Sequence, residues 1–139
     1  MTVSSELSNL RRLRKRAKYQ AAERTRRRIK AAGMAKKPPT SKAYRQLLLM
    51  VDVWERIATR VRKKKALMSS HFLSSPVGYM WNNLSPGIKI IQKNPPKDRG
   101  QKFSAKQFRM LNTAYRRWLK HQTPKFRSAA KSGMGAQFG

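Results

Sequence analysis

Cationic side chains outnumber acidic ones by 34 to 5 in this chain of 139 residues, and this imbalance limits how the chain can fold. The formal net charge is +29, so a compact globule of this composition would repel itself strongly. Leu, Ile, Val and Phe make up only 26 residues, and chains that combine so few apolar side chains with so much charge tend to stay unfolded alone. We therefore expect a polyanion in the folded state, with nucleic acid the first candidate and an anionic membrane surface the second.

The composition also excludes several kinds of protein. Without cysteine there is no disulfide framework, thiolate nucleophile or zinc ribbon. No apolar run approaches the roughly 18 residues that span a bilayer, so we expect no transmembrane segment, and the charged N-terminal region does not resemble a secretory signal. Asp52 and Glu55 are interpreted as local charge balance, His71 as a polar loop contact and His121 as a cation at a helix end. We expect no catalytic residue, metal site, cofactor or small-molecule substrate.

Charge and apolar residues divide the chain into three ranges. We interpret 1–43 as a basic N-terminal arm with one helix, 44–121 as a small helical body, and 122–139 as a basic, glycine-containing tail. The expected fold is mostly α, with two long amphipathic helices and one short helix in the body, joined by irregular loops. Because a core of this size is marginal, we expect partial or no stable structure in isolation.

The arm helix is predicted to be capped by Ser5 or Ser8 and to stop at Gly33, or at the latest at Pro38 and Pro39. Eleven basic residues lie between Leu10 and Lys30, and like charges four residues apart weaken an isolated helix. Bound phosphates would instead stabilise it.

In the body, Thr40 or Ser41 is predicted to cap the first long helix, which should end within 62–68. A cap at 74–75 with Pro76 at the first helical position predicts a short helix over 77–84, followed by a turn over 85–87. An extended piece over 88–91 and a loop over 94–100 should follow.

The last long helix has a clear predicted start. Ser104 and Gln107 match a capping box, and Phe103 and Phe108 match a hydrophobic staple. Pro124 should end this helix.

The chemistry that remains is phosphate binding. Arg presents a planar fork to phosphate oxygens and Lys a mobile point charge, and the chain has 17 of each. We predict that basic residues of the arm, of the body helices and of the tail bind RNA. These are Arg11, Arg12, Arg14, Lys15, Arg16, Lys18, Arg24, Arg26, Arg27, Arg28, Lys30, Lys36, Lys37, Arg60, Lys63, Lys64, Lys65, Arg109, Arg116, Arg117, Lys125 and Arg127.

Aromatic residues next to basic ones allow stacking on unpaired bases. Tyr44 is such a residue, and its helical register also places it on an apolar stripe. For Tyr115 and Trp118 the register favours core packing over stacking. Phe126 and Phe138 lie outside any helical stripe, which makes them better candidates for stacking or for docking on another subunit.

A small body with long Arg- and Lys-rich arms is similar to ribosomal proteins, and this compositional resemblance covers the whole chain. It implies a structural subunit that neutralises rRNA phosphates and bridges rRNA to other ribosomal proteins. Lineage-specific basic subunits are common in organellar ribosomes, so by analogy we expect a mitochondrial ribosome, with a cytoplasmic ribosome or the nucleus as the other locations.

Residues 78–89 (GYMWNNLSPGIK) resemble the Gly-x-x-Trp-x-x-Leu-Ser-x-x-x-Lys segment of HMG boxes. That resemblance implies the alternative of a DNA-bending architectural protein, which would wedge apolar residues into the minor groove. The match fails further on, where Pro95 and Pro96 interrupt the position of the long third helix. A third class, a membrane-surface or scaffold protein, would use the amphipathic helices against lipid.

Overall fold

A computed structural model describes residues 2–97, 103–122 and 124 of the chain. This part of the chain is mostly helical and contains no strand, which confirms the expected fold class. The helices are α1 (Val3–Lys15), α2 (Ala17–Arg28), α3 (Ala31–Ala35), α4 (Lys42–Lys63), α5 (Lys65–Ser74), α6 (Val77–Lys93) and α7 (Lys106–Leu119).

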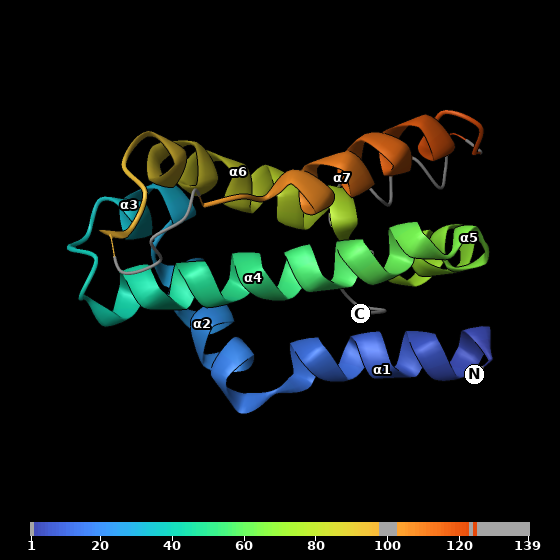
Figure 1. The fold of residues 1–139 in the computed structure, drawn as a ribbon, viewed down its shortest axis with the longest axis horizontal. Coiled ribbons are helices and arrows are strands. Elements are labelled where there is room, and N and C mark those ends of the chain that lie inside the picture. Colours follow the sequence, from blue (N-terminus) through green and yellow to red (C-terminus); the bar gives the residue numbers. More distant parts are fainter. Residues whose placement is uncertain (1, 98–102, 123, 125–139) are drawn as a thin grey trace.

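Helix α4 is the centre of the fold, and each of the other six helices contacts it. Figure 1 shows α6 and α7 on one side of α4 and α1 on the other. The helix begins where expected, because the Ser41 side chain accepts a hydrogen bond from the backbone N–H of Tyr44 at 3.2 Å. Its apolar stripe is buried along its whole length, as the helical spacing indicates. The buried residues are Tyr44, Leu47, Leu48, Met50, Val51, Trp54, Ile57, Ala58 and Val61.

The range predicted as an arm contains three helices rather than one. The chain is extended at Arg16 and again at Ile29, and Thr2 caps α1 in place of Ser5 or Ser8. Gly33 lies inside α3 instead of ending the arm helix. These breaks turn separate short helices onto α4 and α5, so apolar side chains of the range enter the core. They include Leu10, Leu13, Tyr19, Ala22, Ala31 and Met34.

Tyr19 makes the clearest bond between the N-terminal helices and α4. The indole N–H of Trp54 donates to the Tyr19 hydroxyl oxygen at 2.8 Å, and both side chains are buried. Burial raises the pKa of Tyr19 well above its usual value. One core of buried apolar residues therefore includes the ranges 1–43 and 44–121.

Helix α6 corrects the prediction of a short helix, a turn and an extended piece. It is one helix of 17 residues with Pro86 in its interior. Pro86 removes one backbone hydrogen bond, but it is exposed, whereas Leu84, Ile88 and Ile91 form a buried stripe on the same helix. Apolar burial on that stripe outweighs the turn preference of the sequence around Pro86.

Helix α5 was not predicted. Helix α4 ends within the expected range, the chain is extended at Lys64, and α5 then buries Leu67 and Phe72. Pro76 is the N-cap residue of α6 rather than its first helical residue, and no side-chain cap accompanies it. The buried Ser75 hydroxyl finds no hydrogen-bond partner within the described residues.

The predicted capping box at the start of α7 is also wrong. Ser104 accepts a bond from the backbone of Lys106, and the N-cap residue is Ala105. The carboxylate of Glu55 on α4 caps the helix instead, accepting the backbone N–H groups of Gln107 at 2.9 Å and Phe108 at 2.8 Å. An anion at a helix N-terminus satisfies open N–H donors and favours the helix dipole.

The core contains a chain of aromatic contacts. Trp54 stacks on Phe108 with ring centroids 5.3 Å apart, and Trp81 meets the same ring edge-on at 5.0 Å. Phe103 is buried as well. Among the described residues, no helix is both long and apolar enough to cross a membrane.

Candidate nucleic-acid interface

The charged residues on the surface of the described chain are almost all cationic. Of its 29 basic residues, 25 are exposed, whereas of its four acidic residues only Asp52 is exposed. The other acids act within the fold: Glu55 caps α7, Glu23 pairs with two arginines, and Glu6 lies in the first turn of α1. Because the acids are used internally, they leave the cations facing solvent unbalanced.

Most of the predicted RNA-binding residues of 1–43 lie on this exposed surface. Arg11 is half-buried, and its Nε atom has no hydrogen-bond partner within the described part of the chain. The exposed residues are Arg12, Lys15, Arg16, Lys18, Arg24, Arg27, Arg28, Lys30, Lys36 and Lys37.

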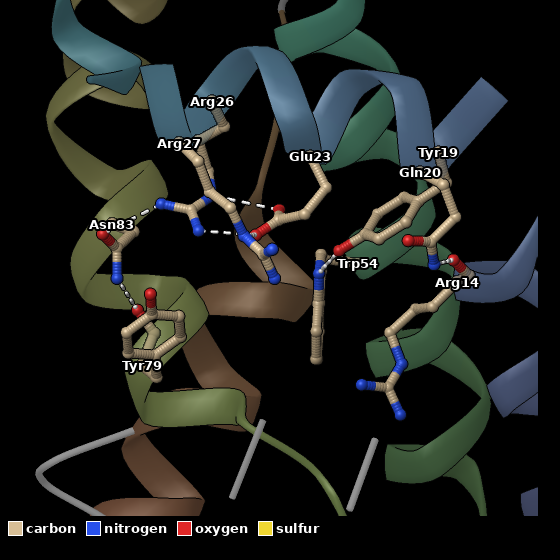
Figure 2. A network of polar contacts seen from close by, with 9 residues as sticks. All are labelled: Arg14, Tyr19, Gln20, Glu23, Arg26, Arg27, Trp54, Tyr79 and Asn83. Atoms are coloured by element: carbon tan, nitrogen blue, oxygen red, sulfur yellow. Dashed lines mark hydrogen bonds and ion pairs between the residues drawn. The ribbon is translucent and has the colours of Figure 1, made fainter. Parts of the chain in front are cut away.

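Arg26 lies inside the protein, only 6% exposed, and ties α2 to α6 (Figure 2). Its guanidinium donates to both carboxylate oxygens of Glu23, and its Nη1 donates to Asn83 Oδ1 at 3.1 Å. The guanidinium also lies over the ring of Tyr79, 5.7 Å from its centroid. The hydrogen bonds that Arg26 donates to Glu23 raise the pKa of Arg26, so the guanidinium stays charged. Because these contacts are all with protein groups, Arg26 is not directed at solvent.

Arg14 is the second predicted phosphate ligand that lies inside, at 7% exposure. Its guanidinium sits 5.4 Å from the ring centroid of Trp54, a cation–π contact. Burial lowers the pKa of Arg14. The side chain is thus packed between α1 and α4 rather than directed outward.

The predicted residues outside 1–43 that the structure describes are exposed. Helix α7, which carries three of them, lies on the opposite side of α4 from α1 (Figure 1). The exposed residues are Arg60, Lys63, Lys64, Lys65, Arg109, Arg116 and Arg117. Lys125 and Arg127 lie outside the described residues, as does the predicted tail apart from Gln122 and Pro124. The described cations therefore cover more than one side of the molecule.

Several exposed cations were missed by the sequence analysis because they lie within amphipathic helices or loops rather than in charge runs. Their exposure follows only from which helix face is buried. They are Lys42, Arg45, Arg56, Lys89, Lys93, Lys97, Lys106 and Lys120.

The aromatic residues are mostly taken up by the core. Tyr44 is 3% exposed, so it cannot stack on a base in this arrangement. Tyr115 packs edge-on against Phe72 at 5.4 Å, and Trp118 lies 5.4 Å from the same ring, which confirms core packing for both. Burial raises the pKa of Tyr115. Phe126 and Phe138 lie outside the described residues.

The described residues hold no group of three or more His, Cys, Asp or Glu side chains that could bind a metal ion. The interpretation of His71 as a loop contact is wrong: it lies in α5 and is 2% exposed. Burial, and then the positive charges of Arg14 and Arg11, lowers its pKa to about 3. His121 follows α7 and is exposed.

What the geometry provides is a folded helical scaffold with cations on several sides and acids directed inward. Such a surface can bind phosphate groups without contacting bases. In comparisons with known proteins, no protein family, no curated protein and no solved structure matches this chain.

Proposed function

We propose that this chain is a non-enzymatic RNA-binding protein, a structural subunit of a ribosome that neutralises rRNA phosphates and contacts neighbouring ribosomal proteins. The single observation that carries the proposal is the surface on which 25 exposed cations face one exposed acid. Nothing else in the described chain can balance that charge, so a dense polyanion is the matching partner.

The distribution of charge favours a partner that surrounds the protein. A binder of a single straight duplex needs one cationic face, whereas here α1 and α7, which both carry exposed cations, lie on opposite sides of α4 (Figure 1). Folded rRNA provides phosphates on several sides of an embedded subunit. The compositional resemblance to ribosomal proteins supports the ribosome as this particle, and the analogy with lineage-specific subunits leads us to propose the mitochondrial one.

The first test is the salt dependence of binding to a structured RNA. If about 8–10 phosphates are contacted, affinity should fall by roughly 10³–10⁵ between 50 and 200 mM salt. Filter binding or fluorescence anisotropy measures this slope. A flat salt response would overturn the proposal.

A matched pair of triple variants separates charge from side-chain shape. Arg12, Arg16 and Arg24 are all exposed, and each is replaced by Gln in one variant and by Lys in the other. If all three contact phosphate, the Gln variant should lose about 2–3 units of the logarithmic salt slope, whereas the Lys variant should keep it. Equal slopes in the two variants would show that these arginines do not bind phosphate.

Two further measurements address the particle and the nucleic acid. The protein should migrate with ribosomal particles in a sucrose gradient and leave them only at high salt; absence from the particles argues against a ribosomal subunit. In competition, structured RNA should displace four-way-junction DNA. A preference for the junction would instead favour the HMG-like alternative.

A further inference from the structure

A cleft lies between α2 and α3 on one side and α6 on the other. Its volume is about 490 Å³, within the range of pockets that hold small organic ligands. The cleft is concave, and its lining combines cations with an aromatic ring and side-chain amides. The lining residues are Arg26, Arg27, Lys30, Ala31, Ala32, Tyr79, Asn82, Asn83 and Pro86.

The cations of the cleft differ in how closely they are bound to other protein groups. Arg26 is held by Glu23 and Asn83 and forms part of the wall, as Figure 2 shows. Arg27 is 71% exposed and meets Glu23 only at 3.5 Å, and Lys30 is exposed. No Asp or Glu lines the cleft, so a phosphate at its mouth would meet two exposed cations and would compete with Glu23 only for Arg27.

The remaining wall suits a planar ring. The aromatic part of the lining is the ring of Tyr79, which is half-buried, and bases stack on tyrosine rings. The guanidinium of Arg26 lies over this ring and is only 6% exposed, so it holds the ring and does not offer a second stacking surface. Ala31 and Ala32 on α3 contribute only short side chains to the lining. The cleft therefore offers one aromatic ring among polar groups.

Hydrogen-bonding groups for a base edge come from α6. Both polar atoms of the Asn83 amide are engaged, with Arg26 and with the Tyr79 carbonyl, which fixes this wall. Asn82 is exposed beside it, so its amide can both donate and accept. Pro86, which also lines the cleft, has no N–H to donate to the carbonyl of Asn82 four residues earlier.

We propose that this cleft binds one unpaired nucleotide, with the base against the ring of Tyr79 and the phosphate on Arg27 and Lys30. The inference rests on the proposed function and deepens it, because it adds a site for single-stranded RNA to a surface that contacts phosphates generally. A paired base cannot enter, since its edge and faces are occupied in the duplex. The same chemistry would bind a free mononucleotide, so the test must separate the two sources.

The test fills the cleft without changing charge. Ala32→Phe places a ring in the cleft, and Ala66→Phe makes the same substitution at an exposed site of α5 that does not line it. Full-length variants are compared by fluorescence anisotropy on a single-stranded RNA 12-mer and on a duplex of the same length. Ala32→Phe should weaken single-strand binding by about 5–10-fold and leave duplex binding unchanged, as expected for the loss of one stacked base. Ala66→Phe should change neither.

A second variant guards against misfolding of the first. Asn82→Ala removes an exposed amide, should keep the far-UV circular dichroism of the native chain, and should weaken single-strand binding about 3–10-fold by removing a base-edge contact. An unchanged ratio of single-strand to duplex affinity in both variants would overturn the cleft proposal even though RNA is bound. Absence of salt-dependent binding to either RNA would instead overturn the proposed function.

Competition identifies the source of the nucleotide. A nucleoside monophosphate at millimolar concentration should displace the single strand from the native chain better than inorganic phosphate does, and Ala32→Phe should abolish this difference. If the monophosphate and inorganic phosphate displace the single strand from the native chain equally well, the cleft does not recognise the base. If the mononucleotide binds as tightly as the 12-mer, the cleft is a site for free nucleotide, and the assignment to a strand of RNA is overturned.

Discussion

His71 should make the fold sensitive to mild acid. It lies on α5, which packs on α1, and its Nε2 atom finds no hydrogen-bond partner within the described chain. Burial, with the positive charges of Arg14 and Arg11 as the smaller causes, lowers the pKa of His71 from 6.5 to about 3. The imidazole therefore stays neutral in the folded protein far into the acid range.

The sign of the effect follows from which state binds the proton. Unfolded His71 takes up a proton near pH 6.5, whereas folded His71 does so only near pH 3. Between these values the unfolded state binds more protons, so the free energy of unfolding falls as pH falls. At about 1.4 kcal/mol per pKa unit, the loss is about 2 kcal/mol between pH 7 and pH 5 and about 3 kcal/mol by pH 4.

Urea unfolding followed by far-UV circular dichroism measures this loss, and urea is chosen because it does not screen charge. His71→Leu should reduce the loss between pH 7 and pH 5 by about 2 kcal/mol, since it removes the side chain that takes up the proton on unfolding. His121→Leu at an exposed position should leave the loss unchanged. If the native chain and His71→Leu lose the same stability, His71 is not buried as a neutral group, and the reasoning fails.

Three further substitutions test contacts between helices by the same unfolding measurement. Glu55→Gln should cost about 1–2 kcal/mol because the carboxylate caps α7, and an unchanged free energy of unfolding would refute the cap. Tyr19→Phe should cost about 1–3 kcal/mol by leaving the buried Trp54 N–H without its acceptor, and an unchanged midpoint would contradict this. Gly87→Ala should lower the free energy of unfolding by about 1–3 kcal/mol, because the added Cβ would lie 2.8 Å from a backbone oxygen of α3. If the variant is instead more stable, as helix propensity alone would predict, α3 can move away from α6.

The parts of the fold that could be predicted are those that depend on neighbours in sequence. The cap at Ser41 and the apolar stripe of α4 are local patterns, and both are present. The cap of α7 comes from Glu55, which is 52 residues away from Gln107, and a local pattern at Ser104 cannot reveal it. The continuation of α6 through Pro86 likewise depends on the burial of residues after it, which only the packed structure determines.

The sequence predicted that the candidate interface is cationic, but not which of its cations are buried or paired. Charge runs identified exposed residues correctly, yet they could not show that Arg14 packs on Trp54. The sequence does contain a local indication that Arg26 is paired. Glu23 lies three residues before Arg26 and four residues before Arg27, and these are the spacings of ion pairs on a helix. The cleft beside Tyr79 had no sequence signal, since its two sides are more than forty residues apart.

The placement of the acids explains how so cationic a chain can have a core and still leave the positive charge of its surface unbalanced. Glu55 accepts bonds from α7 and so stabilises a contact between helices, whereas Glu23 pairs within α2 with Arg26, which in turn bonds to Asn83 of α6. The same placement means that neither carboxylate can offset the exposed arginines and lysines, which repel one another across the surface. A bound polyanion would relieve that repulsion without disturbing the internal bonds. Binding of RNA should therefore increase the stability of the fold. This increase should depend on the charges at the surface and not on those in the core.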